Sequence, residues 1–470
     1  MNVPIISEEQ LNQYMETTTL DISQLSFEGE EVAVDWAKNS IYISQSAKKL
    51  AHSSELQGKL AATNPEYSLY FLENPAMEEP SRSICQGEPF TLIIQCGSHF
   101  QRVNVVITTL PVLYLDLNGT YTDEQERNIM HGKLTLWNSL GSATNSYHTE
   151  TSSVEWHMRG NSTRIYPKRS WKVNLHDEYG QNRNLNLLGL GSDDDLILNP
   201  MCMDDTFLKE KLAQEIWNEL AKGTDYNYQM SSGEYVEVLI NGAYQGVYML
   251  QRRIDAKYLN LNKEADILMK GVNIWEADSI RDAYEIVSTP FDEEQTYQEL
   301  QQALSFRNES SMNIENFVDV SLLLQFLSGV DNYGYKNTFY VLRKSNDAYE
   351  LHLVPWDTDL SLGVTWGYDY EGSISSIIER YELEAVKEKY PDIDVSFAEQ
   401  WKRLRKGVYS EENIYSILDS NVQKLEKSGV TRRDEERWGL LHEGKDNLDN
   451  LRMYIKERLI FLDEYYAQFM

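Results

Sequence analysis

The stretch that decides the fold runs from Asp331 to Gly363 and reads DNYGYKNTFYVLRKSNDAYELHLVPWDTDLSLG. Asp331 opens a short polar loop that Asn337 closes, and two strand-like runs joined by a turn follow. The second run ends at two further carboxylates, Asp357 and Asp359. Because a hairpin brings its two ends together, the pattern predicts that Asp331, Asn337 and Asp357 converge on one side of a small sheet.

Two carboxylates and an amide make a set of hard oxygen ligands. Such a set suits Mg²⁺ or Mn²⁺ better than Zn²⁺, and a metal held by few protein ligands keeps open positions for substrate phosphates. Phosphoryl transfer uses the same groups, because one Asp orients the attacking hydroxyl while an Asn and an Asp hold the metal. The alternative is a polar hairpin with solvated acids, since short Asp and Asn patterns recur by chance.

Length and composition indicate a globular protein with more than one domain. The chain has 470 residues, of which 41% are hydrophobic and 25% charged, so two or three domains and little long-range disorder are expected. The formal net charge of −31 excludes binding to nucleic acids and to anionic membranes as an expected function. It would attract basic partners, although a solvated acidic surface is its commoner meaning.

The sequence shows no membrane-spanning run of about 18 apolar residues. Its start, MNVPIISEEQ, lacks the basic and apolar regions of a signal peptide, so either the protein stays inside the cell or the chain begins after cleavage. The three cysteines, Cys85, Cys96 and Cys202, form no zinc-binding motif. Cys85 and Cys96 would form a disulfide in an exported protein, and two unpaired buried thiols are the alternative.

The order of the predicted elements gives an α+β fold class. Short strands between residues 31 and 109 predict an all-β sandwich of immunoglobulin-like type, so residues 1–109 form an accessory domain. Residues 110–470 form the second domain, in which strands come first and charged helices follow. Between them stand an amphipathic helix over 204–222, capped by Asp204 or Asp205, and a hairpin with an Asn-Gly turn.

Candidate phosphate-binding groups precede the Asp331 loop. The run RGNST at Arg159–Thr163 could offer backbone N–H groups to a phosphate, and a plain turn is the alternative. Lys168 or Lys172, on the next strand, could contact the phosphates of a nucleotide. Glu215 or Glu210 on the following helix would steer that lysine, with a solvated charge as the alternative that we favour for Glu210.

The order of these parts is the one that a kinase fold needs. A loop, a lysine-bearing strand, a helix with an acid, a hairpin, an Asp/Asn loop and an Asp after a strand follow one another along the chain. No Ser/His/Asp arrangement with a nucleophile elbow competes with this interpretation.

Four blocks of sequence carry a resemblance to a known family. They are MRGNSTRIYPKRSWKVNL, DDDLILNPMCMDDTFLKEKLAQEIW, YVEVLINGAYQGVYML and the set DN…KN…VPWDTDLSLG, all between Pro111 and Gly367. With these blocks in this order, the chain resembles the CotH family of spore-coat-protein-H-like atypical protein kinases. The resemblance leaves out the N-terminal β region, and the C-terminal helices match the family only in character.

The resemblance implies a two-lobed, atypical protein-kinase-like domain with a β-rich N-terminal lobe and a helical C-terminal lobe. It implies transfer of the γ-phosphate of ATP, with Mg²⁺ or Mn²⁺, to serines of a protein substrate in the extracellular space, at the cell surface or in the spore coat. A basic, Ser-rich substrate would suit the acidic surface. Asp331 takes the catalytic role, and Asn337 and Asp357 hold the metal. The nucleotide-binding residues implied are Arg159, Asn161, Lys168 or Lys172, and Glu215 as the partner of the lysine.

The chain departs from the family pattern in two places. Lys209 and Glu210 stand where the family has Arg and Asn, and Arg252 stands where it has Glu, in the segment expected to be the hinge. A catalytically inactive scaffold of the spore coat or cell surface is therefore the alternative function. A third interpretation makes residues 1–110 a glycan- or surface-binding module. The intact metal-binding set favours an active kinase, in which Asp359 is structural.

Overall fold

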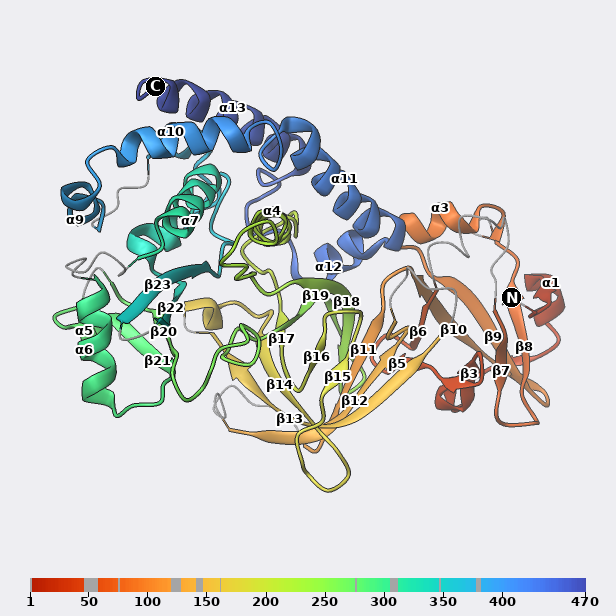
Figure 1. Cartoon of the computed structure of the whole chain (residues 1–470). Coiled ribbons are helices and arrows are strands. Elements are labelled where there is room, and N and C mark those ends of the chain that lie inside the picture. The colour runs from red at the N-terminus through yellow and green to blue at the C-terminus, as the bar shows by residue number, and fades with distance from the viewer. Residues whose placement is uncertain are drawn as a thin grey trace. The chain divides into compact units, whose positions relative to one another are not determined.

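The structure is a computed structural model that describes residues 2–45, 58–74, 77–119, 128–140, 147–160, 162–274, 277–304, 312–345, 348–377 and 382–470. The chain forms two compact units, whose elements are labelled in Figure 1. Unit 1 comprises Met1–Pro200, Gly233–Arg252 and Ser420–Gly439, and unit 2 comprises Met201–Ser232, Arg253–Asp419 and Leu440–Met470. The mixture of helices and strands confirms the α+β class. The boundary near residue 110 stays a prediction.

The N-terminal part of unit 1 contains two sheets. The larger has the order β1-β8-β9-β10-β6-β5 with β2 beside β10, and the smaller has the order β4-β3-β7. Their strands are β1 (Ile5–Ile6), β2 (Met15–Glu16), β3 (Leu25–Phe27), β4 (Glu30–Glu31), β5 (Ala33–Asp35), β6 (Ser40–Ser44), β7 (Leu60–Ala62), β8 (Ser68–Leu72), β9 (Phe90–Cys96) and β10 (His99–Thr108). The helices α1 (Glu8–Leu11), η1 (Ile22–Gln24) and α3 (Pro80–Cys85) connect them.

The two N-terminal sheets share one apolar core. Phe27 of the smaller sheet and Ile43, Leu92 and Val105 of the larger belong to the same buried cluster. The pairs β1–β8, β2–β10 and β6–β10 are parallel, whereas the sheets of an immunoglobulin-like sandwich are antiparallel. The strands expected between residues 31 and 109 are therefore present, and the immunoglobulin-like arrangement is not confirmed.

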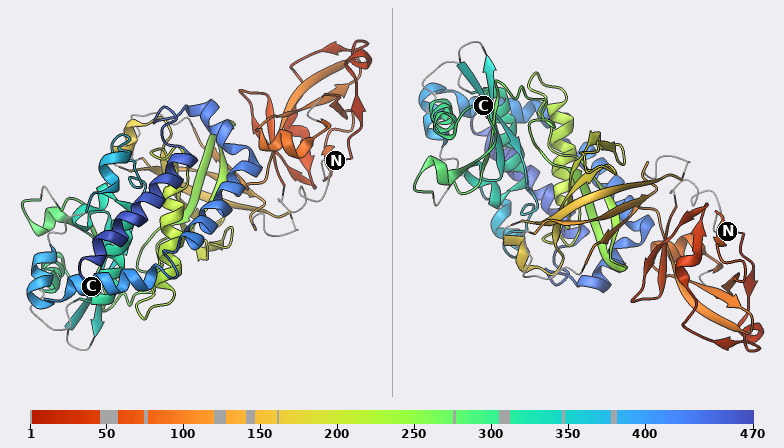
Figure 2. Two further views of the ribbon diagram at one scale, coloured as in Figure 1. Left: turned by 90° about the horizontal axis from the view of Figure 1, so that it is seen from above. Right: turned by 90° about the horizontal axis from the view of Figure 1, so that it is seen from below.

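The second part of unit 1 is a closed barrel with the strand order β11-β12-β13-β14-β17-β19-β18, seen from two sides in Figure 2. Asn241 and Gly242, with φ of 48° and 72°, form the predicted two-residue turn between its last two strands. The strands are β11 (Val112–Leu117), β12 (Met130–Trp137), β13 (Thr149–Arg159), β14 (Ser170–His176), β17 (Asp195–Asn199), β18 (Gly233–Ile240) and β19 (Ala243–Arg252). The helix η4 (Ser162–Ile165) and the strand pair β15 (Leu185–Asn186) and β16 (Ser192–Asp193) lie in the connections.

Helix α12 (Val430–Trp438) packs on β19 through buried ion pairs. The Lys168 ammonium lies 2.6 Å from the Asp434 carboxylate, which also accepts the N–H of Val247 at 2.7 Å. The Arg433 guanidinium donates to both oxygens of Glu237, at 2.5 and 3.1 Å. Such bidentate contacts fix geometry as well as charge, so α12 is held in one position on the barrel.

Unit 2 is built on a four-stranded sheet with the order β21-β20-β22-β23. Helix α7 packs on β23, and α10 lies beside α13 (Figures 1 and 2). The strands are β20 (Ile267–Gly271), β21 (Tyr284–Ser288), β22 (Thr338–Ser345) and β23 (Ala348–Pro355). The helices are α4 (Lys209–Ala221), α5 (Ile280–Ala283), α6 (Glu293–Leu304), α7 (Ile314–Leu327), η5 (Val330–Tyr335), α8 (Tyr370–Ile374), α9 (Glu382–Lys389), α10 (Ile393–Leu404) and α13 (Leu448–Ala467), while α11 (Glu411–Ser428) has residues in both units. Among the described residues, no helix has the length and apolar content to cross a membrane.

Helix α4 begins five residues later than the predicted cap at Asp204, because the backbone at Phe207 is left-handed with φ of 59°. The N-cap position falls on Leu208, whose side chain makes no cap. Asp204 still accepts the N–H of Lys209, at 2.7 Å, from outside the helix. The Lys209 ammonium is fully buried between Asp204, at 2.8 Å, and Asp446, at 2.6 Å. A buried charge with two carboxylate partners anchors the first turn of α4.

The buried Arg458 of α13 ties together two segments of unit 2. Its guanidinium donates to the carbonyl of Gln325 near the end of α7, at 3.0 Å from Nε, and to the carbonyls of Ile374 and Ser376. Helix ends leave carbonyls without intrahelical partners, so one buried cation here satisfies groups from two chain segments.

Cys85, Cys96 and Cys202 form no disulfide in the part of the chain that the structure describes. Cys85 is exposed, while Cys96 and Cys202 are half-buried. Of the two alternatives from the sequence, the disulfide between Cys85 and Cys96 is therefore absent from this structure, and the exposure of Cys85 differs from the expected buried thiol.

Asp319 is an isolated buried carboxylate in α7. It accepts hydrogen bonds from the Tyr226 hydroxyl at 2.9 Å and from the Gln400 amide at 2.6 Å. Burial raises its pKa to about 6, and the charge of Glu315 acts in the same direction. The folded protein therefore binds this proton more tightly than the unfolded chain does.

We predict that Asp319→Asn stabilises the protein at neutral pH. The wild type should lose stability as the pH rises from about 4 to about 6, because the folded pKa lies above the unfolded value, and the loss should persist at higher pH. At about 1.36 kcal/mol per pKa unit, the variant should gain roughly 1–3 kcal/mol at pH 7.5 and little near pH 4. Urea unfolding across this range measures the difference. A difference that does not change with pH would contradict the raised pKa.

Candidate functional site

The Asp331 loop begins where α7 ends. Ser328, with φ of 48°, terminates the helix, and its N–H bonds back to the carbonyl of Gln325. The short helix η5 then carries Asp331, and Gly334, with φ of 59°, lets the chain turn toward β22. The predicted polar loop is thus a helix end followed by a left-handed turn, which glycine allows without strain.

The hairpin that follows brings the two ends of the loop region together. Strands β22 and β23 pair in antiparallel register, with Thr338 opposite Pro355. Asn337 stands directly before this pair and Asp357 soon after it, so both leave the sheet at the same end. Both have left-handed backbones, with φ of 53° and 57°. Such conformations in non-glycine residues concentrate at functional sites.

The buried Asn332 fixes the distance between these segments. Its side-chain amide donates to the carbonyl of Trp356, at 2.8 Å, directly before Asp357. Longer contacts of 3.5 Å reach the carbonyls of Lys336 and Asn337. One amide therefore joins the loop after α7 to the chain that leaves β23.

The carboxylate of Asp331 has two partners. Its Oδ2 accepts a hydrogen bond from the Asn337 amide at 2.7 Å, and its Oδ1 lies 2.6 Å from the Lys336 ammonium. The backbone N–H of Asn337 in turn bonds to the carbonyl of Gly271 in β20, at 2.9 Å. The structure thus brings Asp331 and Asn337 into direct contact, at the sheet end where Asp357 also emerges.

Negative charge is concentrated around Asp359. Its Oδ1 accepts the N–H of Leu360 at 2.9 Å. Burial and the charges of Asp357, Glu210 and Asp331 hold the pKa of Asp359 well above its usual range. Perturbed carboxylates of this kind cluster at catalytic and metal sites, and structural networks also produce them.

The metal site expected from the sequence is not shown by the structure. Among the described residues, no three or more His, Cys, Asp or Glu side chains are arranged to hold a metal ion. The predicted set adds the amide of Asn337 to Asp331 and Asp357. A cation there would offset the repulsion that raises the pKa of Asp359.

The remaining predicted residues belong to the other unit or to α4. Lys168 contacts Asp434, Lys172 lies 3.2 Å from Asp195, and Arg159 donates to the hydroxyl of Ser170 at 3.4 Å, all within unit 1. Asn161 lies outside the described residues. Glu215 in unit 2 is 3.2 Å from Lys211. Since the two units are described separately, the pairing of Lys168 or Lys172 with Glu215 stays a prediction.

The sequence missed three residues of the site. Glu210 is buried, at 3% exposure, and accepts from Gln214 at 3.2 Å, so the solvated charge that we favoured for it is wrong. Its neighbours from Lys209 to Gln214 are buried too, and an amphipathic pattern gives no sign of this. Asn332 and Lys336 stood in the quoted loop, where their contacts depend on the folded hairpin.

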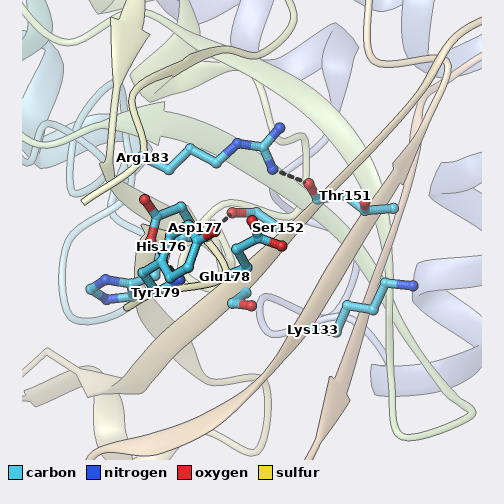
Figure 3. A pocket seen from close by; sticks show the side chains of 9 residues that line it. Lys133, Thr151, Ser152, His176, Asp177, Glu178, Tyr179 and Arg183 are labelled. Atoms are coloured by element: carbon cyan, nitrogen blue, oxygen red, sulfur yellow. Dashed lines mark hydrogen bonds between the residues drawn. The ribbon is translucent and has the colours of Figure 1, made fainter. Parts of the chain in front are cut away.

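A surface pocket of about 480 Å³ lies elsewhere, on the outside of β12, β13 and β14 (Figure 3). Arg183 is bound to Glu150 and to the carbonyl of Thr151, and Asp177 accepts backbone N–H groups of its own loop. None of the predicted site residues lines this pocket. It carries both signs of charge in Lys133 and Glu178, so it indicates no ligand class.

Comparison with known proteins identifies a family whose model covers the Asp331 region. The family model described as CotH kinase protein matches residues 156–462, which include the barrel strands from Trp156 onward, α4 and the Asp331–Asp359 region. A search of curated proteins found no match. Because the family match spans more than half of the 470 residues, the chain belongs to the CotH kinase protein family.

Proposed function

We propose that the protein is a Mg²⁺- or Mn²⁺-dependent protein kinase that transfers the γ-phosphate of ATP to serine. The observation that supports this most is the contact between Asp331 and Asn337 beside the acidic chain of Asp357 and Asp359. In phosphoryl transfer the protein mainly positions the reactants and offsets charge, which needs few groups held firmly. The family suggests ATP and a divalent metal for the same reaction.

In this proposal the side chains of the Asp331 region have separate roles in the reaction. Asp331 orients the serine hydroxyl and accepts its proton, while Asn337 and Asp357 hold the metal. The metal, when bound, neutralises charge on the phosphates. Asp359 supports the loop through Leu360, and Asn332 keeps the loop beside Trp356.

The nucleotide-binding part of the proposal rests on the family motifs. Arg159 and Asn161 would contact phosphates through the RGNST turn, and Lys168 or Lys172 would bind the α- and β-phosphates opposite Glu215. Lys168 has the ion pair with Asp434 described above, and Lys172 has the one with Asp195. Replacing each lysine separately by Met, and comparing ATP affinity, would assign the contact.

The substrate we propose is a basic, Ser-rich protein of the spore coat or cell surface, outside the cell. The net charge of −31 supports this, because a surface of that sign attracts basic polypeptides and repels nucleic acids. The family's association with the spore coat points to the same location.

We predict that Asp357→Ala abolishes phosphorylation and that Asp331→Asn strongly slows it. Purified protein with Mn²⁺ and labelled ATP should modify itself or a basic Ser-rich peptide. Asp331→Asn should reduce kcat by about 10²–10⁴-fold, the usual contribution of a positioned base. Asp449→Ala, which removes an exposed carboxylate of the same unit, is the matched control and should leave the rate unchanged. Equal labelling by Asp357→Ala and the wild type would count against the assignment.

We predict that Asn332→Ala weakens both the fold and the reaction. It leaves the carbonyl of Trp356 without its donor, which should cost about 1–3 kcal/mol of unfolding free energy. Because Asp357 would no longer be held beside Asp331, kcat should fall more than the affinity for ATP does. Steady-state kinetics at a temperature where the variant stays folded separates the two effects. An unchanged kcat would show that the bond serves stability alone.

The second candidate is an inactive scaffold that kept the fold. Arg252 supports it, because this residue replaces the family's Glu and donates to the buried Asp193 at 2.7 Å. Because the Arg252 guanidinium is positively charged and is paired with Asp193, it cannot take the role of the family's Glu in the expected hinge.

The two candidates differ in nucleotide binding. For an active kinase we predict that ATP with Mg²⁺ raises the melting temperature, since a ligand that binds only the folded state stabilises it. Asp357→Ala should remove most of this shift, and Asp449→Ala should keep it. No shift in the wild type at millimolar ATP would favour the scaffold.

A further inference from the structure

Both carboxylate oxygens of Asp331, the proposed general base, already have a partner in the structure. The ammonium of Lys336 lies 2.6 Å from one oxygen of Asp331, and the amide of Asn337 is 2.7 Å from the other. The contact with Lys336 is reached by solvent, because 29% of the lysine side chain and 20% of the aspartate side chain are exposed. A ligand entering from solvent can therefore reach this ion pair.

An Asp that accepts a proton from a serine hydroxyl needs an oxygen free for it. The Lys336 ammonium, at 2.6 Å, lies directly against one of the two carboxylate oxygens of Asp331. A serine hydroxyl that approaches Asp331 therefore competes with its two partners, Lys336 and Asn337, for access to the carboxylate oxygens.

Lys336 is the partner that can leave. Asn337 is fixed by its own backbone bond to Gly271 and by its left-handed conformation, and its proposed metal role requires it to stay. Lys336 carries its charge on a flexible four-carbon stem, so its ammonium can move without moving the loop. In the proposed reaction the terminal phosphate of ATP brings a new anion to the site.

We propose that Lys336 is a phosphate-contacting catalytic residue that rests on Asp331 and transfers to the γ-phosphate oxygens when ATP binds. This inference rests on the proposed function. In the transfer, the serine oxygen forms a bond to the γ-phosphorus, and the bond to the bridging oxygen breaks to leave ADP. The serine proton passes to Asp331 and then to solvent. The ammonium offsets charge on the transferred group and frees the Asp331 oxygen.

The test is the ratio of affinities for a triphosphate and a diphosphate. Isothermal titration with Mg²⁺ compares ADP with the non-hydrolysable ATP analogue that has NH in place of the β,γ-bridging oxygen. Lys336→Met should weaken binding of the analogue roughly tenfold or more and leave the affinity for ADP unchanged, because the proposed contact is made to the γ-phosphate. Lys402→Met, at an exposed lysine of the same unit, is the matched control and should bind both nucleotides like the wild type.

The ion pair between Lys336 and Asp331 in the nucleotide-free protein leads to a second prediction. Asp331→Asn should tighten binding of the analogue, because the ammonium no longer has to leave a carboxylate. In the double variant with Lys336→Met this gain should disappear. If Asp331→Asn tightens binding of the analogue equally in the wild type and in the Lys336→Met variant, the loss of one negative charge explains the whole effect. That result would overturn the proposal that Lys336 must leave Asp331 before it binds the phosphate.

The outcomes separate the two proposals. If the wild type binds neither nucleotide, the proposed kinase function fails, and the inference fails with it. If the wild type binds the analogue and Lys336→Met keeps the same ratio of affinities, only the role of Lys336 is wrong. Circular dichroism of each variant shows that a loss of binding is not a loss of fold.

Discussion

A buried hydrogen bond from the Asn332 amide to the carbonyl of Trp356 helps to join the two chain segments that carry the candidate site, together with backbone bonds from Val330 to Leu360 and from Leu362 to Leu327. Asp331 and Asn337 lie before the hairpin, and Asp357 lies after it. Strand pairing brings these segments to the same end of the sheet, but pairing stops at Thr338 and Pro355. Beyond that point the β22–β23 ladder ends, and the chain is held by the buried Asn332 side chain and by single backbone bonds such as the one from Asn337 to Gly271.

The site also depends on charge that lies outside it. The Lys209 ammonium, buried between Asp204 and Asp446, fixes the first turn of α4 and with it the next residue, Glu210. Glu210 adds its negative charge to that around Asp359. Although burial opposes its ionisation, the Lys209 ammonium keeps the pKa of Asp204 below its usual range. The buried ion pair of Lys209 thus places a further carboxylate, that of Glu210, near enough to Asp359 to raise the pKa of Asp359.

Local chemistry explains which features could be predicted from the sequence. The Asn-Gly turn and the β22–β23 hairpin depend on neighbouring residues, and both were found where expected. The late start of α4 and the burial of Glu210 depend on contacts with distant residues such as Asp446, and no periodicity encodes them. Cross-strand partners in the N-terminal sheets are likewise set by the whole fold, so alternation found the strands and not their parallel pairing. The roles of Asp331, Asn337 and Asp357 came from motif and family resemblance, and their chemistry stays a prediction.

The guanidinium of Arg458 has a consequence for synthesis of the chain. It closes the end of α7, from which the Asp331 loop departs, yet it is made 133 residues after Gln325. While the ribosome is still adding those residues, the carbonyls at the end of α7 lack this donor. The contact of Arg458 with the end of α7 can therefore form only after the ribosome has passed residue 458, so this part of unit 2 is completed late in synthesis.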